Sequence, residues 1–492
     1  MGHAVCIVKP KNEHQYELDF ESLKKILLQD GVQNADVMLV SIAGAFRQGK
    51  SFLLNFFLRY LNSDDQSDWM EDESDNLEGF SWRGGMDRET TGILMWSRAF
   101  PRELPSGEKV VVLLMDTQGV FDSESTVKDN AIVFALSTMM SSFFIYNIQN
   151  NIQEDHLQHL QVFTEYGRLA LKEDSHKPFQ KLLFLVRDWS YPYDADYGSA
   201  GGKFLLKRRM KISDSQHPEL QLLRKHISSC FQDISCFLLP HPGHKVSTDP
   251  SFSGRLSDID SEFKEHLGVL VPLVLSVKNT TVKEIGGQKV KAKDLLHYFQ
   301  SYMKVLSGHE LPEPITLFFA TVQASNLVAL SGAIDFYKKQ MNRVCGGTRP
   351  YIIPEQLAEQ HSRLKTAAVH QFISVPQMGG AEFSKKYHAM LESDIDEMFR
   401  EYMLVNKRKN IGAVVKIPAV YVTIAVVSYI ISGILETVHL PALAIVMQGF
   451  THCALGIIVL WAIIWRFGIF GGLEEIIETV ADIVWVAALM QT

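Results

Sequence analysis

The segment "GAFRQGKS", residues 44–51, lies between the apolar segments "DVMLVSIA" (36–43) and "FLLNFFLRYL" (52–61) and is the most informative motif of the chain. It matches G-x-x-x-x-G-K-[ST], and a strand before it with a helix after it is the context that a phosphate-binding loop requires. In such a loop, glycines let backbone N–H groups approach phosphate oxygens at the positive end of a helix. We therefore predict that Lys50 reaches the terminal phosphates of a nucleotide and that the Ser51 hydroxyl can hold Mg²⁺.

A second motif, "MDTQG" (115–119), ends the apolar run that begins at Val110. A carboxylate at the carboxyl end of a buried strand beside a phosphate loop can hold Mg²⁺ through water, and a following glycine lets a backbone N–H face the terminal phosphate. Asp116 and Gly119 are therefore predicted to sense that phosphate. Gln118 precedes the glycine, so we assign it nucleotide contact rather than the positioning of water.

Between these motifs, "SWRGGMDRETTGILMW" (81–96) is a polar loop that enters a strand-like run. A switch segment in this position supplies a hydroxyl to Mg²⁺ and a carbonyl to the attacking water. Thr90 is the predicted ligand, with Thr91 as the alternative, although a Thr-Thr pair also suits a strand by propensity alone.

Base recognition is predicted in the apolar run "KLLFLVRDWS" (181–190), which places Arg187 and Asp188 at a strand end. An aspartate there can accept hydrogen bonds from N1–H and the exocyclic amine of guanine, a pair that adenine does not offer. The familiar N/T-K-x-D is missing, so a surface ion-pairing dipeptide stays an alternative. The later stretch "LLPHPGHKV" (238–246) could form a loop that caps the base.

The order of strand-like and helical patterns divides the chain into domains. Apolar strand-like runs alternate with helical patterns over residues 1–307, which predicts an α/β domain with parallel strands. Two prolines in "SGHELPEP" mark a linker at 308–314, and the helical patterns of 315–407 predict a three-helix bundle. The length of 492 residues has room for several domains.

Two apolar stretches, 417–435 and 440–465, are long enough to cross a bilayer as helices, the alternative being two buried core helices. Basic residues precede the first stretch and Arg466 follows the second, so both termini are predicted to be cytosolic. Residues 472–490 show helical spacing of apolar residues opposite an acidic face. This amphipathic helix could insert into lipid by its apolar face or pack against the protein.

The amino-acid composition limits which ligands and partners are expected. Lys and Arg number 48 against 56 Asp and Glu, a net charge of −8 that gives no reason to expect nucleic acid. The five cysteines form no CxxC pair, which suits a reducing compartment and no structural zinc site. His156 and His159 lie one helical turn apart but lack a third ligand, so we interpret them as part of a core or dimer-face helix.

Several stretches together resemble the atlastins, dynamin-superfamily GTPases that fuse tubules of the endoplasmic reticulum. These are "AGAFRQGKSFLLNFFLRY", "SWRGGMDRETTGI", "LLMDTQGVFDS", "EDHLQHLQVFTEYGRLA", "LFLVRDWSYPY" and "CFLLPHPGHKV", followed by the helical segment, the apolar hairpin and the tail. The resemblance covers nearly the whole chain, and "RD" in place of the usual base motif is typical of this family and of the related guanylate-binding proteins.

The resemblance implies an α/β P-loop GTPase domain, a helical bundle, a two-span transmembrane hairpin and a C-terminal amphipathic helix. It also implies GTP and Mg²⁺ as ligands, a homodimer formed with a copy on an opposing membrane, and residence in the endoplasmic reticulum membrane. A guanylate-binding-protein-like tether or membrane-shaping protein without fusion activity is the alternative.

The resemblance also assigns roles to individual residues of this sequence, by their position in the family's motifs. Arg47 matches the arginine that atlastins turn onto the phosphates when they dimerise, and with Thr90 it is expected to be catalytic. Mg²⁺ is expected at Ser51, Thr90 and Asp116. Gln48 stands where a basic residue is frequent, and Asp249 where asparagine is frequent. The expected nucleotide contacts are Gly44, Arg47, Gln48, Gly49, Lys50, Ser51, Phe52, Gln118, Gly119, Arg187, Asp188, Val246 and Asp249.

Overall fold

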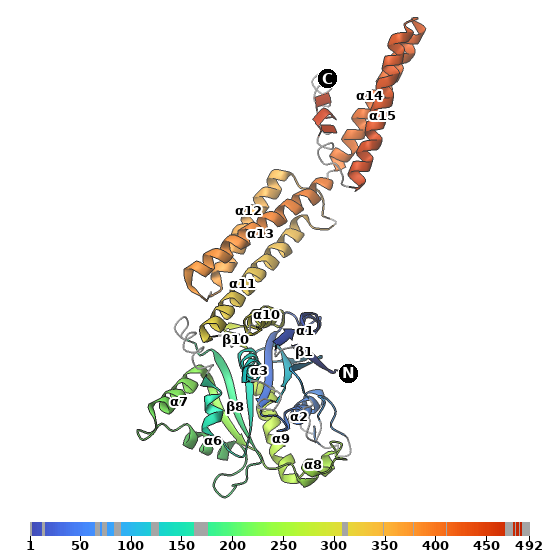
Figure 1. The fold of residues 1–492 in the computed structure, drawn as a ribbon. Helices are drawn as coiled ribbons and strands as arrows, with labels where there is room; N and C mark the ends of the chain where they lie inside the picture. The colour runs from blue at the N-terminus through green and yellow to red at the C-terminus, as the bar shows by residue number, and fades with distance from the viewer. Residues whose placement is uncertain are drawn as a thin grey trace. The chain divides into compact units, whose positions relative to one another are not determined.

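A computed structural model describes most of the chain (Figure 1). The described residues are 2–11, 15–63, 69–70, 76–82, 90–119, 127–161, 176–307, 313–347, 349–376, 378–409, 411–467, 476–477, 479–481 and 483–484. The chain forms two compact units, one of Met1–Ser331 with Ile373–His388, the other of Gly332–Phe372 with Ala389–Thr492. The first unit therefore takes in parts of the helical segment as well as residues 1–307.

The first unit is built on a mixed sheet with the order β2-β1-β4-β6-β3-β7-β8-β9, and β5 pairs with β6. Strands β6, β3, β7, β8 and β9 run parallel, whereas β4, β1, β2 and β5 pair antiparallel. The prediction of parallel strands is thus correct for the centre of the sheet and wrong for its N-terminal edge. The nine strands are Ala4–Lys11 (β1), Gln15–Leu18 (β2), Asp36–Gly44 (β3), Ile93–Trp96 (β4), Phe100–Glu103 (β5), Lys109–Thr117 (β6), Phe143–Gln149 (β7), Phe179–Arg187 (β8) and Phe231–Leu238 (β9).

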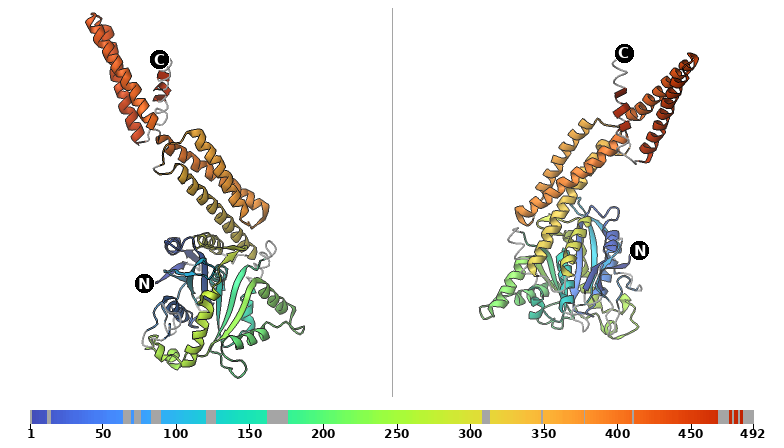
Figure 2. Two further views of the ribbon diagram at one scale, coloured as in Figure 1. Left: turned by 180° about the vertical axis from the view of Figure 1, so that it is seen from behind. Right: turned by 45° about the horizontal axis from the view of Figure 1, so that its top comes forward.

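Helices cover both faces of this sheet, as Figures 1 and 2 show. The helices of this region are Phe20–Leu27 (α1), Lys50–Asn62 (α2), Val127–Met140 (α3), Glu154–Gln158 (α4), Gly198–Arg209 (α6), Pro218–Cys230 (α7), His244–Thr248 (α8), Ser261–Leu275 (α9) and Leu295–Leu306 (α10). A short hairpin, Glu284–Ile285 (β10) and Gln288–Lys289 (β11), precedes α10.

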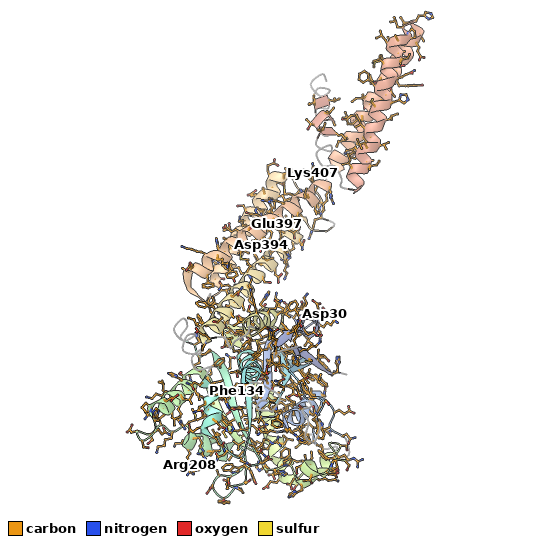
Figure 3. All side chains as sticks on the ribbon, in the orientation of Figure 1. Asp30, Phe134, Arg208, Asp394, Glu397 and Lys407 are labelled. Atoms are coloured by element: carbon orange, nitrogen blue, oxygen red, sulfur yellow. The ribbon has the colours of Figure 1, made fainter. Side chains whose placement is uncertain are left out.

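Alternating side chains of the central strands supply the two cores. On β3, Val37 and Leu39 face the core that contains α1, α3, α7 and α10, whereas Met38 and Val40 face the core that contains α2 and α9. The period of two is that of a strand buried on both faces, which explains the unbroken apolar run in the sequence. Phe134 on α3, labelled in Figure 3, packs edge-on against Phe144 and Tyr146 of β7.

Three long helices follow: Pro314–Cys345 (α11), Pro354–Ser374 (α12) and Gly380–Arg408 (α13). The start of α11 belongs to the first unit, where Thr321 lies 3.0 Å from the hydroxyl of Tyr302 on α10. In the second unit, the Tyr337 hydroxyl of α11 lies 2.8 Å from Nδ1 of His361 on α12, and that imidazole stacks on Phe399 of α13 at 3.9 Å. Buried side chains such as Ile395 fill the same bundle.

Two further helices, Ile411–Thr437 (α14) and Pro441–Phe467 (α15), pack side by side along their length (Figures 1 and 2). Small polar groups bridge them, as where Ser432 donates to the Ala444 carbonyl at 3.1 Å. Three described helices are long and apolar enough to span a bilayer, within Pro314–Cys345, Ile417–Thr437 and Pro441–Ile464. The first is 61% buried in protein against 33% and 11% for the others, so α14 and α15 are the two that expose most of their apolar surface. Most of the predicted tail helix, 472–490, lies outside the described residues.

Candidate nucleotide-binding site

The candidate site lies where the parallel strands end. Strand β3 ends at Gly44, a loop follows, and α2 begins at Lys50. Gly49 caps this helix with a φ of 67°, and a Cβ there would lie 2.8 Å from Nη1 of Arg187. A side chain would be strained and crowded at this position, so glycine is required. The loop therefore presents backbone N–H groups at a helix N-terminus, the arrangement that binds phosphate.

Four polar side chains meet beside this loop. The Ser51 hydroxyl donates to Oδ2 of Asp116 at 2.6 Å, and Oγ1 of Thr90 lies 3.1 Å from Ser51 Oγ and 3.4 Å from the same carboxylate oxygen. The register between β3 and β6 brings Ser51 and Asp116 together, because Asp116 of β6 pairs with Ile42 of β3, just before the loop. The Lys50 ammonium donates to the Ala45 carbonyl at 3.0 Å.

Burial determines the electrostatics of this cluster. Asp116 is fully buried, which raises the pKa of its carboxyl to about 6, while the Ser51 hydroxyl and the Lys50 charge act in the opposite direction. Two hydroxyls and a carboxylate are the oxygen ligands that Mg²⁺ prefers, and a divalent cation would stabilise the buried carboxylate. The residues present therefore fit a magnesium site.

The "DTQG" segment runs against the phosphate loop. Gly119 lies so close to it that a Cβ would come within 2.1 Å of the Phe46 Cα. The Gln118 side chain is held by protein groups, since its Oε1 accepts from the Gly92 N–H at 2.8 Å and its Nε2 donates to the Tyr16 hydroxyl at 2.7 Å. The nucleotide contact expected for Gln118 stays a prediction. Its own N–H donates to the Gly92 carbonyl at 2.8 Å. Gln118 thus binds protein groups, and the backbone of Gly119 is the part that faces the loop.

Arg187 and Asp188 lie next to the same loop. The Arg187 guanidinium is buried, donates through Nη1 to the Gln48 carbonyl at 2.9 Å, and lies over the Phe263 ring at 5.7 Å. Burial lowers the pKa of this guanidinium. Asp188 has a φ of 57°, and its Oδ1 is buried without a hydrogen-bond partner among the described residues. An orphaned carboxylate oxygen at a strand end is suited to accept from a base.

Two further predicted residues, Arg47 and Phe52, differ in their exposure to solvent. Arg47 is exposed, with a left-handed φ of 64°. Phe52 has its ring buried against Trp82 at 5.1 Å, and Trp82 contacts Phe252 at 5.5 Å, so only the backbone of Phe52 can face a ligand. These rings connect α2 to the loop around α8.

In that loop, Val246 packs towards the core of α2 and α9. The Asp249 carboxylate accepts from the N–H and hydroxyl of Ser251 at 2.8 and 2.6 Å, which lowers its pKa. The Asp249 side chain thus caps its own turn, and the nucleotide contact expected for this residue stays a prediction.

Two residues of β7 belong to the site although sequence reasoning missed them. Asn147 donates to the Gln48 carbonyl at 2.9 Å, and Gln149 donates to Oδ2 of Asp188 at 2.9 Å. Both hold the loop and the aspartate in place. Their signal was present in "FFIYNIQ" (143–149), where two amides interrupt an apolar strand at its carboxyl end.

His156 and His159 pack on β7. His159 Nδ1 lies 3.0 Å from the Tyr146 hydroxyl, and His156 Nδ1 accepts from the Gln153 N–H at 3.1 Å. Burial lowers the pKa of both imidazoles. Among the described residues, no three His, Cys, Asp or Glu side chains form a group that could hold a metal ion.

Comparison with known proteins agrees with this geometry. The family model for the guanylate-binding protein N-terminal domain matches residues 13–284. Atlastin of Drosophila melanogaster is 52% identical over 470 residues, which cover 95% of this chain and 86% of the relative. Human Atlastin-2 is 49% identical over 479 residues (97% and 82%), and mouse Atlastin-1 is 48% identical over 481 residues (98% and 86%). The chain therefore belongs to the atlastin family of dynamin-superfamily GTPases, and its N-terminal domain hydrolyses GTP.

Proposed function

We propose that this GTPase is anchored in the endoplasmic reticulum membrane and joins two such membranes by dimerising in trans with a copy of itself. The observation that carries the proposal is the buried cluster of Ser51, Thr90 and Asp116 beside Lys50, on a chain that continues into the apolar helices α14 and α15. A phosphate-sensing site and a membrane hairpin in one chain can convert hydrolysis into work on a bilayer.

Each site residue has a proposed task. Ser51, Thr90 and Asp116 would hold Mg²⁺, which when bound neutralises charge on the phosphates. Lys50 would bind the terminal phosphates, and the Gly119 N–H would report their presence. Asp188 would select guanine through its buried Oδ1, for which the described residues offer no hydrogen-bond partner.

Arg47 is the proposed catalytic arginine. In this structure it is exposed on the loop. Dimerisation would turn it onto the phosphates, where a guanidinium in cis neutralises the charge that develops during transfer and accelerates hydrolysis about 10³–10⁵-fold. Because the arginine enters the site only in the dimer, hydrolysis would be coupled to the meeting of two copies.

A second function has an observation in its favour. The closely packed α14 and α15 could act as a wedge that shapes the membrane, with the nucleotide domain serving only as a tether. Fusion and shaping differ in their need for nucleotide, since a wedge works by its volume in the bilayer.

Lys50→Ala separates the two. In vesicles that carry the full chain, the fusion proposal predicts that Lys50→Ala abolishes GTP-dependent clustering and lipid mixing, because the terminal phosphates lose their cation. Vesicle curvature, measured by electron microscopy, would stay as in the wild type. Clustering and mixing that persist in Lys50→Ala, at wild-type rates and without GTP, would rule out the fusion proposal in favour of shaping.

A further inference from the structure

The side chain and backbone of Gln118 hold the two predicted phosphate-sensing segments together. Its reciprocal bonds with Gly92, both 2.8 Å, fix "DTQG" against the segment that contains Thr90. Gly119, the residue that runs against the phosphate loop, follows immediately. Gln118 is 1% exposed, so water cannot replace these partners. A movement of either segment must therefore carry Gln118 along or break its bonds.

The third bond of Gln118 leads out of the site. Its Nε2 donates to the Tyr16 hydroxyl at 2.7 Å, and Tyr16 is buried on β2 with its ring in the core that contains α10. The backbone of the same tyrosine contacts the end of α10, since the Ser307 hydroxyl lies 3.1 Å from the Tyr16 carbonyl and 2.6 Å from the Met303 carbonyl. Tyr16 thus contacts "DTQG" with its side chain and the last turn of α10 with its backbone.

These hydrogen bonds join residues that are far apart in the sequence. Gln118 and Tyr16 are 102 residues apart, and Ser307 and Tyr16 are 291 apart. A phenylalanine ring would fill the core at Tyr16 equally well, so packing alone does not require the hydroxyl. The Tyr16 hydroxyl accepts a hydrogen bond from Gln118 in the predicted switch segment, and burial makes loss of that bond costly.

We propose that Tyr16 is a positioning residue that couples the phosphate sensor to the end of α10, the helix that precedes α11 in the chain. A shift of "DTQG" between the GTP and GDP states would move Gln118, and Tyr16 would transmit that shift to Ser307. The proposal rests on the proposed role of "DTQG" as the phosphate sensor.

The test uses the full chain in detergent micelles and three variants. Tyr16→Phe removes the hydroxyl and keeps the ring. Ser307→Ala removes the contact at the far end of the path. Tyr302→Phe is the matched control. It also removes a buried tyrosine hydroxyl, but this hydroxyl lies on α10 and contacts Thr321 at 3.0 Å instead of Gln118. The readouts are kcat and KM for GTP hydrolysis, and hydrogen exchange with GDP and with a nonhydrolysable GTP analogue.

We expect Tyr16→Phe to lower kcat about tenfold, the factor that corresponds to one lost buried hydrogen bond, with KM unchanged. We expect Ser307→Ala and Tyr302→Phe to keep kcat. In the wild type, exchange at residues 303–307 should differ between the two nucleotides. That difference should vanish in Tyr16→Phe and Ser307→Ala and remain in Tyr302→Phe.

Two results would overturn the role of Tyr16, and a third would overturn the sensor role on which it rests. A kcat in Tyr16→Phe equal to that of Tyr302→Phe would mean that the hydroxyl does not position Gln118. Nucleotide-dependent exchange at 303–307 that survives in Tyr16→Phe would mean that the path carries no coupling. If the wild type shows no nucleotide-dependent exchange around 116–119, the sensor role itself is wrong, which identifies failure of the proposed function rather than of Tyr16.

Discussion

Individual residues in this protein hold charges that burial makes expensive. The fully buried Asp116 carboxylate is stabilised by the Ser51 hydroxyl at 2.6 Å, the Thr117 N–H at 3.0 Å and the nearby Lys50 charge, whereas the buried Arg187 guanidinium lies against a carbonyl and an aromatic face. Burying an unpaired charge costs several kcal/mol, so such groups persist where a ligand completes them. The same reasoning applies to Oδ1 of Asp188, which has no hydrogen-bond partner within the part of the chain that the structure describes.

Asp188 sets the base preference if it binds guanine. Asp188→Asn replaces an acceptor with a group that also donates, so two hydrogen bonds to a charged acceptor are lost and GTP affinity should fall at least about 100-fold. Xanthosine triphosphate carries a carbonyl where guanine has its amine, so its affinity should rise. Asp194→Asn, an exposed aspartate shortly after it, is the control. Equal GTP affinity of the wild type and Asp188→Asn by fluorescence titration would refute this assignment.

Lys283 gives the protein a pH-dependent stability. It is fully buried, donates to the Ser141 carbonyl at 2.9 Å, and burial lowers its pKa from 10.5 to about 7. The unfolded chain keeps this proton up to about pH 10.5 while the folded chain loses it above pH 7. Below pH 7 the folded protein therefore bears the full cost of burying a charged lysine. Between the folded and unfolded pKa values this cost is relieved, and the free energy of unfolding rises by up to about 1.4 kcal/mol per pH unit.

Lys283→Met removes this titration. The gain in melting temperature from pH 7 to pH 9, measured by scanning fluorimetry of the full chain, should be larger in the wild type than in Lys283→Met. Lys291→Met, an exposed lysine nearby, should behave as the wild type does. Identical gains in all three proteins would show that Lys283 carries no penalty.

The secondary-structure elements differ in how far local sequence determines them. The phosphate loop, the end of β6 and the end of β8 could be predicted because each motif is continuous in sequence and joins a strand to its functional residue. The antiparallel edge could not, because β1 and β4 pair across about 90 residues with no local signal. The bonds of Gln118 were missed for the same reason, since Tyr16 is remote in sequence.

Helix α13 shows which side chains hold the three-helix bundle. Ile395 is fully buried, whereas Glu397, labelled in Figure 3, is exposed on the same helix. Ile395→Ala should lower the free energy of unfolding of the bundle by about 2–4 kcal/mol through the lost contacts and the cavity. Glu397→Ala should change it by less than about 0.5 kcal/mol. Protease resistance of the bundle measures both, and equal resistance of the two variants would contradict this packing.

At the scale of the whole molecule, the hairpin determines on which side of the membrane each part lies. If α14 and α15 are the two spans, as we propose, residues 438–440 between them would face the lumen and both termini would face the cytosol. The apolar α11 could be mistaken for a third span by its hydropathy, but its burial in protein argues against this. A third span would place the N-terminus on the opposite side from the C-terminus.

A glycosylation acceptor tests this topology. Inserted after His439, it should be modified in microsomes, whereas acceptors added at either terminus should stay unmodified, because the modifying enzyme acts in the lumen. Gel mobility before and after deglycosylation gives the answer. Modification at the N-terminus would mean an odd number of spans.

Lipid mixing between two populations of liposomes that carry the full chain, with GTP and Mg²⁺, decides whether this GTPase fuses membranes. We expect mixing for the wild type, none with a nonhydrolysable GTP analogue, and a loss in Arg47→Ala that parallels its loss of hydrolysis. Vesicles that cluster but do not mix lipids, while the wild type hydrolyses GTP, would contradict this expectation and identify the protein as a tether.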